Sequence, residues 1–162
     1  MSNLDKIEIK RSRDADTRSA QSIPSKEQLM DNTLSHIDDV QHWCYRLADK
    51  LKEQSLNHDH TKIDYIDEFY NDFIEQLQSE DKPNFKEMNW FKNRHLTERH
   101  HLNDNVPDDV NLIDVLEMVV DCTCAGLARS GNVYDINIPE EVLKKAINNT
   151  KQLIIDNTEV VD

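Results

Sequence analysis

Apolar residues recur at steps of three and four along most of the chain after Pro24, which is the period of a helix that buries one face. The longest stripe predicts a helix over residues 25–54, and Ser25 with Gln28 supplies a capping box at its start. Its apolar positions are Leu29, Thr33, Ile37, Val40, Trp43 or Cys44, Leu47 and Leu51. Shorter stripes predict four further helices, over residues of about 61–79, 85–103, 109–129 and 139–156.

The first residues carry no such stripe. Residues 1–22 combine Ser and Asp with charges of both signs, a composition that buries too little apolar surface to order itself. We therefore expect a disordered or loosely attached arm over residues 1–22 and one folded domain over residues 23–162. With two glycines and four prolines, the chain lacks the turn residues of an all-β protein. The predicted fold is an all-α, single-domain bundle of about five helices.

The net charge of the chain limits the kinds of molecule that it is expected to bind. The formal net charge is −13, from 32 acidic and 19 basic residues, and such a surface repels long nucleic acid. A small nucleotide stays compatible with this charge, because metal ions would neutralise its phosphates locally. No apolar run is long enough to cross a membrane and the N-terminus has no signal-peptide pattern, so we expect a cytoplasmic protein. The three cysteines lack disulfide spacing and are expected to be reduced.

Five of the seven histidines form an ordered series with two aspartates. In chain order the series is His36, His58, Asp59, His95, His100, His101 and Asp121. Imidazoles and carboxylates are ligands of borderline divalent metals, so the series indicates a metal site. For His36, which lies beside Ile37 at the edge of an apolar stripe, a structural histidine bonded to a backbone carbonyl is an equally good interpretation.

The histidines at positions 95, 100 and 101 raise a geometric question. On one straight helix, positions 95 and 100 differ by about 140° and positions 100 and 101 by about 100°, so the three cannot share a face. Either the helix ends or bends near Thr97–Glu98, or one histidine of the doublet does not bind the metal directly. The competing interpretation is a solvated polar segment, because Arg94, Glu98 and Arg99 flank the histidines.

Three carboxylates line one face of the predicted helix over residues 109–129, at Asp114, Glu117 and Asp121. The neighbours of Asp121 are apolar, and a carboxylate in such surroundings is costly to bury unless it is paired or metal-bound. We therefore expect Asp121 to bind metal. Glu117 is the better candidate for a structural role or for supporting the ligands.

Cationic side chains near the series are candidates for binding a phosphate. Lys62 follows Asp59 by three residues, on the same face of a helix that begins there, and could reach a phosphate oxygen. Arg94 and Arg99 could assist it. The competing interpretation makes Lys62 a solvated residue at a helix start. Asp59 and Lys62 are the candidate catalytic residues, and Lys62, Arg94 and Arg99 are the candidate substrate contacts.

The order His, His-Asp-x-x-Lys, His, His-His, Asp over about residues 30–130 resembles the HD superfamily of metal-dependent phosphohydrolases. It is most similar to the dinuclear branch that includes the HD-GYP cyclic-dinucleotide phosphodiesterases. The chain also resembles a family of small phage and bacterial proteins with the same His-Asp string. The resemblance implies an all-α fold that hydrolyses phosphate esters, mostly of nucleotides. It also implies one or two divalent ions (Fe, Mn, Co, Ni, Zn or Mg), every member of the series as a ligand, and Lys62 as a phosphate contact.

Two features depart from that family. The Gly-Tyr-Pro signature is absent, so cleavage of cyclic dinucleotides is not predicted. Only four residues separate His95 from the doublet, whereas the family usually carries these histidines on separate helices. A single-metal site made of His36, His58, Asp59 and Asp121 would match the simpler branch.

These observations support one leading hypothesis and one alternative. The leading hypothesis is a metal-dependent phosphohydrolase that acts on a small nucleotide, as a phosphomonoester or a phosphodiester. The alternative is a non-catalytic acidic helical protein that sequesters a nucleotide or inhibits a protein partner. Since related helical phosphohydrolases often dimerise, the resemblance also suggests a homodimer. The sequence lacks a Gly-rich phosphate loop, a Gly-x-Ser-x-Gly elbow and a His-Glu-x-x-His helix. The enzyme classes that these three motifs define are therefore excluded.

Overall fold

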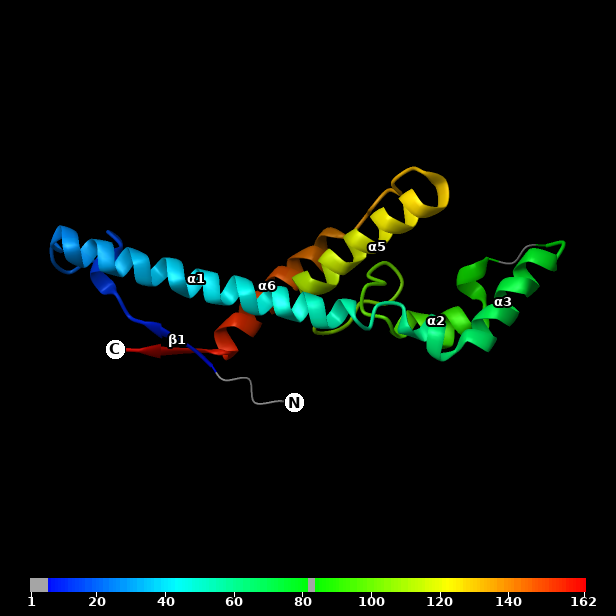
Figure 1. The fold of residues 1–162 in the computed structure, drawn as a ribbon, viewed down its shortest axis with the longest axis horizontal. Helices are drawn as coiled ribbons and strands as arrows, with labels where there is room; N and C mark the ends of the chain where they lie inside the picture. The colour runs from blue at the N-terminus through cyan, green and yellow to red at the C-terminus, as the bar shows by residue number, and fades with distance from the viewer. Residues whose placement is uncertain (1–5, 82–83) are drawn as a thin grey trace. The chain divides into compact units, whose positions relative to one another are not determined.

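The structure, a computed structural model, describes residues 6–81 and 84–162. It is mostly helical, with 63% of the described residues in helices and a two-stranded sheet, which confirms the all-α prediction (Figure 1). The chain divides into two compact units. The first comprises residues 1–50 with 151–162, and the second comprises residues 51–150. The arm over residues 1–22 and the single domain over residues 23–162 remain a prediction.

The first unit is built on α1 (Lys26–Ser55), most of which it contains (Figure 1). The predicted boundaries are correct to one residue at each end, and the capping box is present. The Gln28 backbone N–H donates to Ser25 Oγ at 3.2 Å, and the Ser25 N–H donates to Gln28 Oε1 at 2.9 Å. Two orphan donors of the helix start are thereby satisfied, which is why the helix begins here.

A strand pair joins the two ends of the chain within the same unit. β1 (Ile7–Lys10) pairs in parallel with β2 (Thr158–Val161), with Ile7 opposite Thr158. The short helix η1 (Arg13–Ala15) follows β1. The hydrophobic pattern did not predict β1, which lies in the expected arm; residues 1–5 of that arm lie outside the described residues. A four-residue strand is too short to be recognised without its distant partner.

The second unit contains the remaining helices. They are the last turn of α1, α2 (His60–Asp64), α3 (Ile66–Gln78), η2 (Phe85–Glu87), α4 (Asn89–Asn93), η3 (His95–Thr97), α5 (Leu112–Ser130) and α6 (Glu140–Asp156) up to Thr150. The predicted helix over 61–79 is interrupted at Tyr65, whose backbone is not helical and whose ring lies under the Arg94 guanidinium at 4.1 Å.

The predicted helix over residues 85–103 is wrong. Only α4 is an α-helix there, η3 is a single 3₁₀ turn, and residues 98–111 contain no helix. The reason is tertiary, because Leu102 is fully buried in the core formed with α5 and α6. That core comprises Leu102, Val110, Val115, Met118, Val142 and Ala146. To reach it the chain must leave the helical path before the histidine doublet.

A second buried cluster is aromatic and lies between α3, α4 and η3. Trp90 is completely buried and packs against Phe69 with ring centroids 4.4 Å apart. Its other neighbours include Phe91 and His95, whose ring stacks on Trp90 at 4.7 Å. Trp90 Nε1 donates to the carbonyl oxygen of Thr61 at 3.3 Å, which ties α4 to α2. The aromatic cluster therefore supports the segment that carries the histidines.

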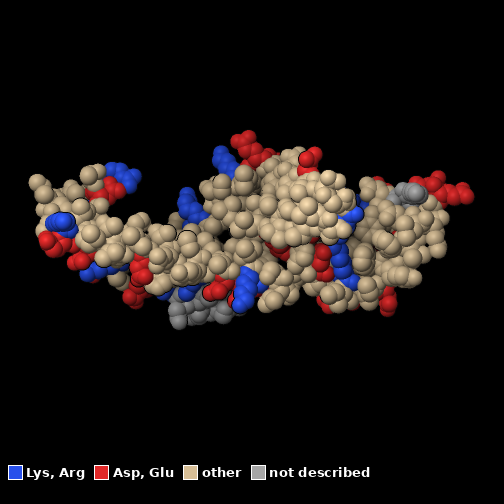
Figure 2. All heavy atoms as spheres, turned by 45° about the horizontal axis from the view of Figure 1, so that its top comes forward, with Lys and Arg blue, Asp and Glu red and all other residues tan. Residues whose placement is uncertain are grey.

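Charged side chains are spread over the exposed surface. On the face drawn in Figure 2, carboxylates and cations lie among uncharged side chains, with no large basic patch. None of the helices in the described part of the chain is long and apolar enough to cross a membrane.

Candidate metal centre

The centre of the site is Asp59, in the turn between α1 and α2. Its φ of 55° and ψ of 20° lie in the left-handed region, and it is the only described residue other than glycine with a positive φ. Aspartate tolerates this conformation better than most side chains, but such an arrangement needs support from its surroundings. Lys62, on α2, forms an ion pair with the Asp59 carboxylate. Burial alone would raise the pKa of Asp59, but the hydrogen bond and charge of Lys62 outweigh it and lower that pKa.

Two histidines meet on one side of Asp59. His95 Nε2 and His101 Nε2 lie 2.9 Å apart, and His95 Nε2 is 3.7 Å from Asp59 Oδ1. A hydrogen bond orients the His95 ring, because its other nitrogen, Nδ1, lies 3.1 Å from Thr61 Oγ1. Burial and the neighbouring His101 lower the pKa of His95 to about 3, and burial with His100 lowers the pKa of His101 to about 4. Both rings are therefore neutral at physiological pH, the state in which imidazole binds metal.

His58 and Asp121 lie on the other side of Asp59. His58 Nε2 is 3.6 Å from Asp59 Oδ2 and 3.5 Å from Asp121 Oδ1. Asp121 comes from α5, four residues after Glu117, so it lies one turn further along the same helix face. The three side chains are partly buried. This arrangement brings together a histidine and two carboxylates from two distant segments.

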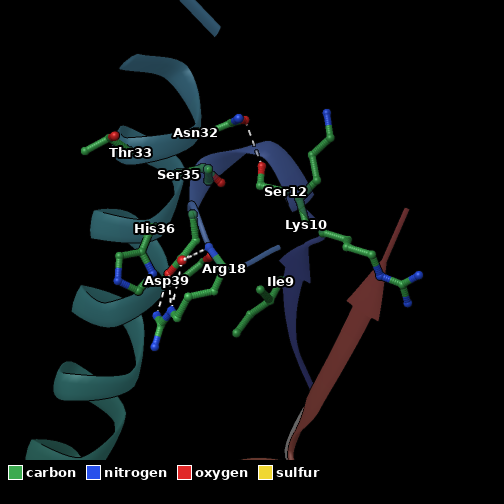
Figure 3. A pocket seen from close by; sticks show the side chains of 12 residues that line it. Ile9, Lys10, Ser12, Arg18, Asn32, Thr33, Ser35, His36 and Asp39 are labelled. Atoms are coloured by element: carbon green, nitrogen blue, oxygen red, sulfur yellow. Dashed lines mark hydrogen bonds and ion pairs between the residues drawn. The ribbon is translucent and has the colours of Figure 1, made fainter. Parts of the chain in front are cut away.

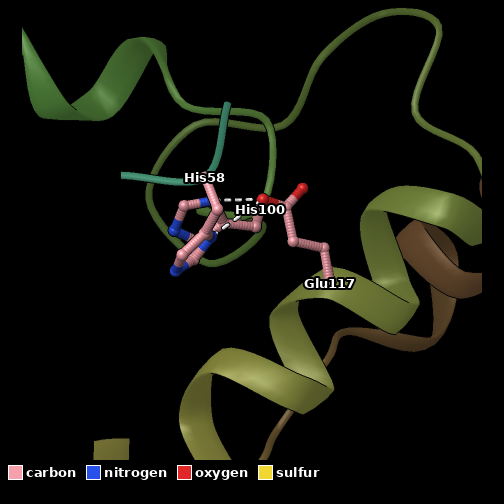
Figure 4. Close-up of side chains that lie close together, drawn as sticks. All are labelled: His58, His100 and Glu117. Atoms are coloured by element: carbon pink, nitrogen blue, oxygen red, sulfur yellow. Dashed lines mark hydrogen bonds and ion pairs between the residues drawn. The ribbon is translucent and has the colours of Figure 1, made fainter. Parts of the chain in front are cut away.

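The carboxylate of Glu117 lies next to the imidazole rings of His58 and His100 (Figure 4). Its Oε1 is 2.9 Å from His58 Nδ1 and 3.4 Å from His100 Nδ1. The 2.9 Å contact is a hydrogen bond, whereas 3.4 Å is longer than a normal one. Burial alone would raise the pKa of Glu117, but His100, Gln54 and His58 outweigh it and lower the pKa to about 2. Glu117 is therefore ionised, and its charge raises the pKa of His100 against the opposing effect of burial.

A buried carboxylate network holds α5 in place beside the site. Asp114 is completely buried and accepts from Arg99 Nε at 2.7 Å and Arg99 Nη2 at 2.9 Å. Gln54 Nε2 donates to Asp114 at 2.9 Å and also to Glu117. Asp114 completes the capping box of α5 by accepting from the Asn111 backbone N–H at 2.9 Å. The network connects the end of α1 to the start of α5 and to the chain before the histidine doublet.

Several polar atoms at the centre have no hydrogen-bond partner. Asp59 Oδ1 and both ring nitrogens of His100 are buried without one. Three overlapping groups have ligand atoms within 4.8 Å of one another: His58, His100 and Glu117; Asp59, His95 and His101; and His58, Asp59 and Asp121. Buried polar groups are normally hydrogen-bonded, so unpartnered atoms facing one another suggest a missing partner. The described part of the chain therefore has histidine and carboxylate groups positioned to bind a metal.

Most of the series predicted from the sequence meets at this site. His58, Asp59, His95, His100, His101 and Asp121 all lie in the second unit and belong to the three groups. The end of the α-helix answers the geometric question, since His95 lies in the single 3₁₀ turn η3 and the doublet lies in non-helical chain, so the three histidines do not follow one α-helical period. The helix ends at Asn93, before His95 and earlier than the predicted end or bend near Thr97–Glu98.

His36 lies elsewhere, in the first unit. It lines a cavity of about 440 Å³ between α1 and the segment after β1 (Figure 3). Its neighbours there include Asp39 of α1 and Arg18, whose guanidinium pairs with Asp16. His36 is not a member of the histidine and carboxylate groups found among the described residues.

The two arginines predicted as substrate contacts are engaged with carboxylates. Arg94 pairs with Glu68 at 3.1 Å, and Arg99 pairs with Asp114 and Asp109. The structure also adds a residue that sequence reasoning missed, Thr61, which contacts His95 through its hydroxyl. Its place two residues after Asp59 was the only available signal, and it does not distinguish a histidine partner from a helix cap.

The arrangement defines a helical protein with a candidate metal centre at the junction of α1, α2 and α5. Residues 25–159 match a family of unknown function, DUF5662, and the chain belongs to that family. Comparison with curated proteins found no match, and comparison with solved structures found none either.

Proposed function

We propose that the protein is a metal-dependent phosphohydrolase that acts on a small nucleotide. The proposal combines the geometry around Asp59 with the resemblance of the His, His-Asp, His, His-His, Asp order to the HD superfamily. An acidic chain with no large basic patch on the face drawn in Figure 2 suits a small ligand better than a nucleic acid. The proposed ions are one or two divalent metals among Fe, Mn, Co, Ni, Zn and Mg.

The spacing of the atoms around Asp59 carries the proposal. The nearest nitrogens of His58, His95 and His100 lie 3.6, 3.7 and 3.8 Å from Asp59 oxygens. These separations are too long for hydrogen bonds. Two ligands that each lie about 2.1 Å from a tetrahedral ion are about 3.4 Å apart. The donors are therefore separated as ligands of a shared ion would be, and Asp59 is placed between two groups of them.

Asp59 and Lys62 have different roles in the proposed hydrolysis. Asp59 Oδ1 faces His95 and His100 while Oδ2 faces His58, so one carboxylate can serve two neighbouring ions. Held by Asp59 and the histidines, a divalent ion would lower the pKa of water toward neutrality and so provide the nucleophile for attack on phosphorus. Lys62 contacts Asp59 and is partly exposed, so its ammonium can neutralise a phosphate oxygen. Lys62 is the proposed phosphate contact because its partner, Asp59, belongs to the metal site itself, whereas Arg94 and Arg99 pair with Glu68 and Asp114.

Removal of the metal tests the proposal directly. Protein purified without chelator is expected to hold about one to two divalent ions per chain, measured by plasma mass spectrometry. A panel of nucleoside monophosphates and nucleotide diesters is then assayed before dialysis against chelator, after it, and after the ion is returned. Hydrolysis should disappear with the ion and return with it. Protein that carries no metal, or that holds metal but hydrolyses no member of the panel, would contradict the proposal.

Lys62→Met is expected to lower kcat/KM about a hundredfold while metal content stays unchanged. The substitution keeps the aliphatic stem but removes the charge that meets the phosphate. Metal affinity is not expected to fall, because Lys62 competes with the ion for the Asp59 carboxylate and its removal ends that competition. The measurement is steady-state kinetics together with metal content. Lys92→Met, at an exposed lysine of α4, is the matched control and should match the unmodified protein. Unchanged kinetics in Lys62→Met would remove Lys62 from the mechanism.

A further inference from the structure

The buried Glu117 contacts two of the proposed metal ligands at once. It is 8% exposed, and its Oε1 lies against the Nδ1 atoms of His58 and His100 (Figure 4). The two rings lie beside each other, with centroids 4.5 Å apart. One oxygen atom therefore lies behind both imidazoles, on the side away from Asp59.

This position determines which nitrogen faces the site. With Nδ1 directed at Glu117, the Nε2 atoms of both rings are directed at Asp59, at 3.6 Å for His58 and 3.8 Å for His100. An imidazole that donates from Nδ1 keeps its lone pair on Nε2. A metal-binding histidine commonly donates its other ring N–H to a carboxylate in this way, which sets the tautomer and the direction of the lone pair.

We propose that Glu117 is a positioning residue that holds His58 and His100 together as Nδ1–H tautomers and directs both Nε2 atoms to the metal. The inference rests on the metal site of the proposed function and adds a role that the order of the ligands does not contain. Glu117 itself does not bind the ion. Its Oε1 is hydrogen-bonded to His58 Nδ1 and lies 3.4 Å from His100 Nδ1, and its Oε2 accepts from Gln54.

Gln54 prevents the Glu117 carboxylate from turning toward the site. Its amide nitrogen donates to Glu117 and, at 2.9 Å, to Asp114. Asp114 is in turn held by two nitrogens of Arg99. The carboxylate of Glu117 is thus anchored on the side opposite the histidines, as a rigid support for ligand geometry requires.

Glu117→Gln tests the role, with Zn²⁺ as the probe. The substitution keeps the size but removes the charge, and its amide group competes with the imidazole donors. The Zn²⁺ affinity, measured by competition with a chromophoric chelator, is expected to fall about tenfold to hundredfold with the number of bound ions unchanged. Glu98→Gln is the matched control, because Glu98 is equally buried but its carboxylate contacts the Thr61 N–H and His60. That variant should keep the affinity of the unmodified protein.

The tautomers are measured on the unmodified protein, so the test does not depend on the folding of a variant. In the Zn²⁺-loaded protein, the ¹⁵N chemical shifts of His58 and His100 should show Nδ1 protonated and Nε2 bound to metal. Binding through Nδ1, an unchanged affinity in Glu117→Gln, or the loss of one ion from that variant would each overturn the positioning role. The last result would make Glu117 a ligand. If the unmodified protein binds no Zn²⁺ or other divalent ion, the proposed function itself fails.

Discussion

Asp59→Asn is expected to abolish metal retention and phosphate-ester hydrolysis together. The carboxylate faces both sets of ligands, with Oδ1 toward His95 and His100 and Oδ2 toward His58. An amide keeps the shape but loses the charge and can offer only one oxygen. Replacement of an outer partner of a metal ligand costs about tenfold to hundredfold, so loss of the shared ligand should exceed a factor of about a hundred in affinity and activity.

Asparagine is the informative replacement at this position. Asp59 has a φ of 55°, and asparagine tolerates that conformation whereas alanine is strained in it. Any loss of metal in Asp59→Asn therefore reflects the missing charge rather than a distorted turn. Asp64→Asn, at an exposed aspartate of α2, is the control and should keep both metal and activity. If Asp59→Asn held the normal complement of metal at normal affinity, the site around Asp59 would not exist as described.

Asp114→Asn is expected to produce the largest loss of stability among single changes near the site. Asp114 is completely buried and receives four hydrogen bonds, from Arg99 twice, from Gln54 and from the Asn111 N–H. Removal of one partner of a buried ion pair leaves the other charge uncompensated, at a cost of about 3–5 kcal/mol when both groups are fully buried. Because the Arg99 side chain is 36% exposed, we expect the lower end, about 3 kcal/mol.

The same arginine provides the control for this prediction. Asp109 also pairs with Arg99, at 3.0 Å, but its side chain is 79% exposed. Exposed ion pairs contribute about 0–1 kcal/mol, so Asp109→Asn should be close to neutral. Urea unfolding followed by circular dichroism measures both variants. For a chain of this length, a loss of about 3 kcal/mol lowers Tm by about 6–12 °C. Equal effects of the two substitutions would show that burial of Asp114 does not determine its contribution.

The two predictions also separate the roles of neighbouring carboxylates. Asp59→Asn should change metal content with little change in stability, and Asp114→Asn should change stability first. Asp114 pairs with Arg99 and Gln54, whereas its helix neighbour Glu117 contacts two histidines. Sequence periodicity placed Asp114 and Glu117 on one face of α5. It could not assign their roles, because each role depends on which side chains lie opposite the carboxylate.

The helical pattern of the sequence is enough to locate the long helices. α1, α5 and α6 follow stripes at steps of three and four, and the ends of α1 are correct to one residue because Ser25 and Gln28 cap it locally. The segment over 85–103 failed because its backbone is determined by distant contacts. Leu102 is buried in a core with α5 and α6, and His95 stacks on Trp90.

The sequence by itself predicted the helical class and the identity of Asp59 and of five side chains that lie around it, because periodicity and side-chain chemistry are local properties. Only the tertiary structure decided the pairing of β1 with β2, the non-helical path through the histidine doublet and the position of Glu117 behind two imidazoles. Each of these depends on residues far apart in the chain. Their distances and orientations are set by burial and by hydrogen bonds between segments, which no local pattern contains.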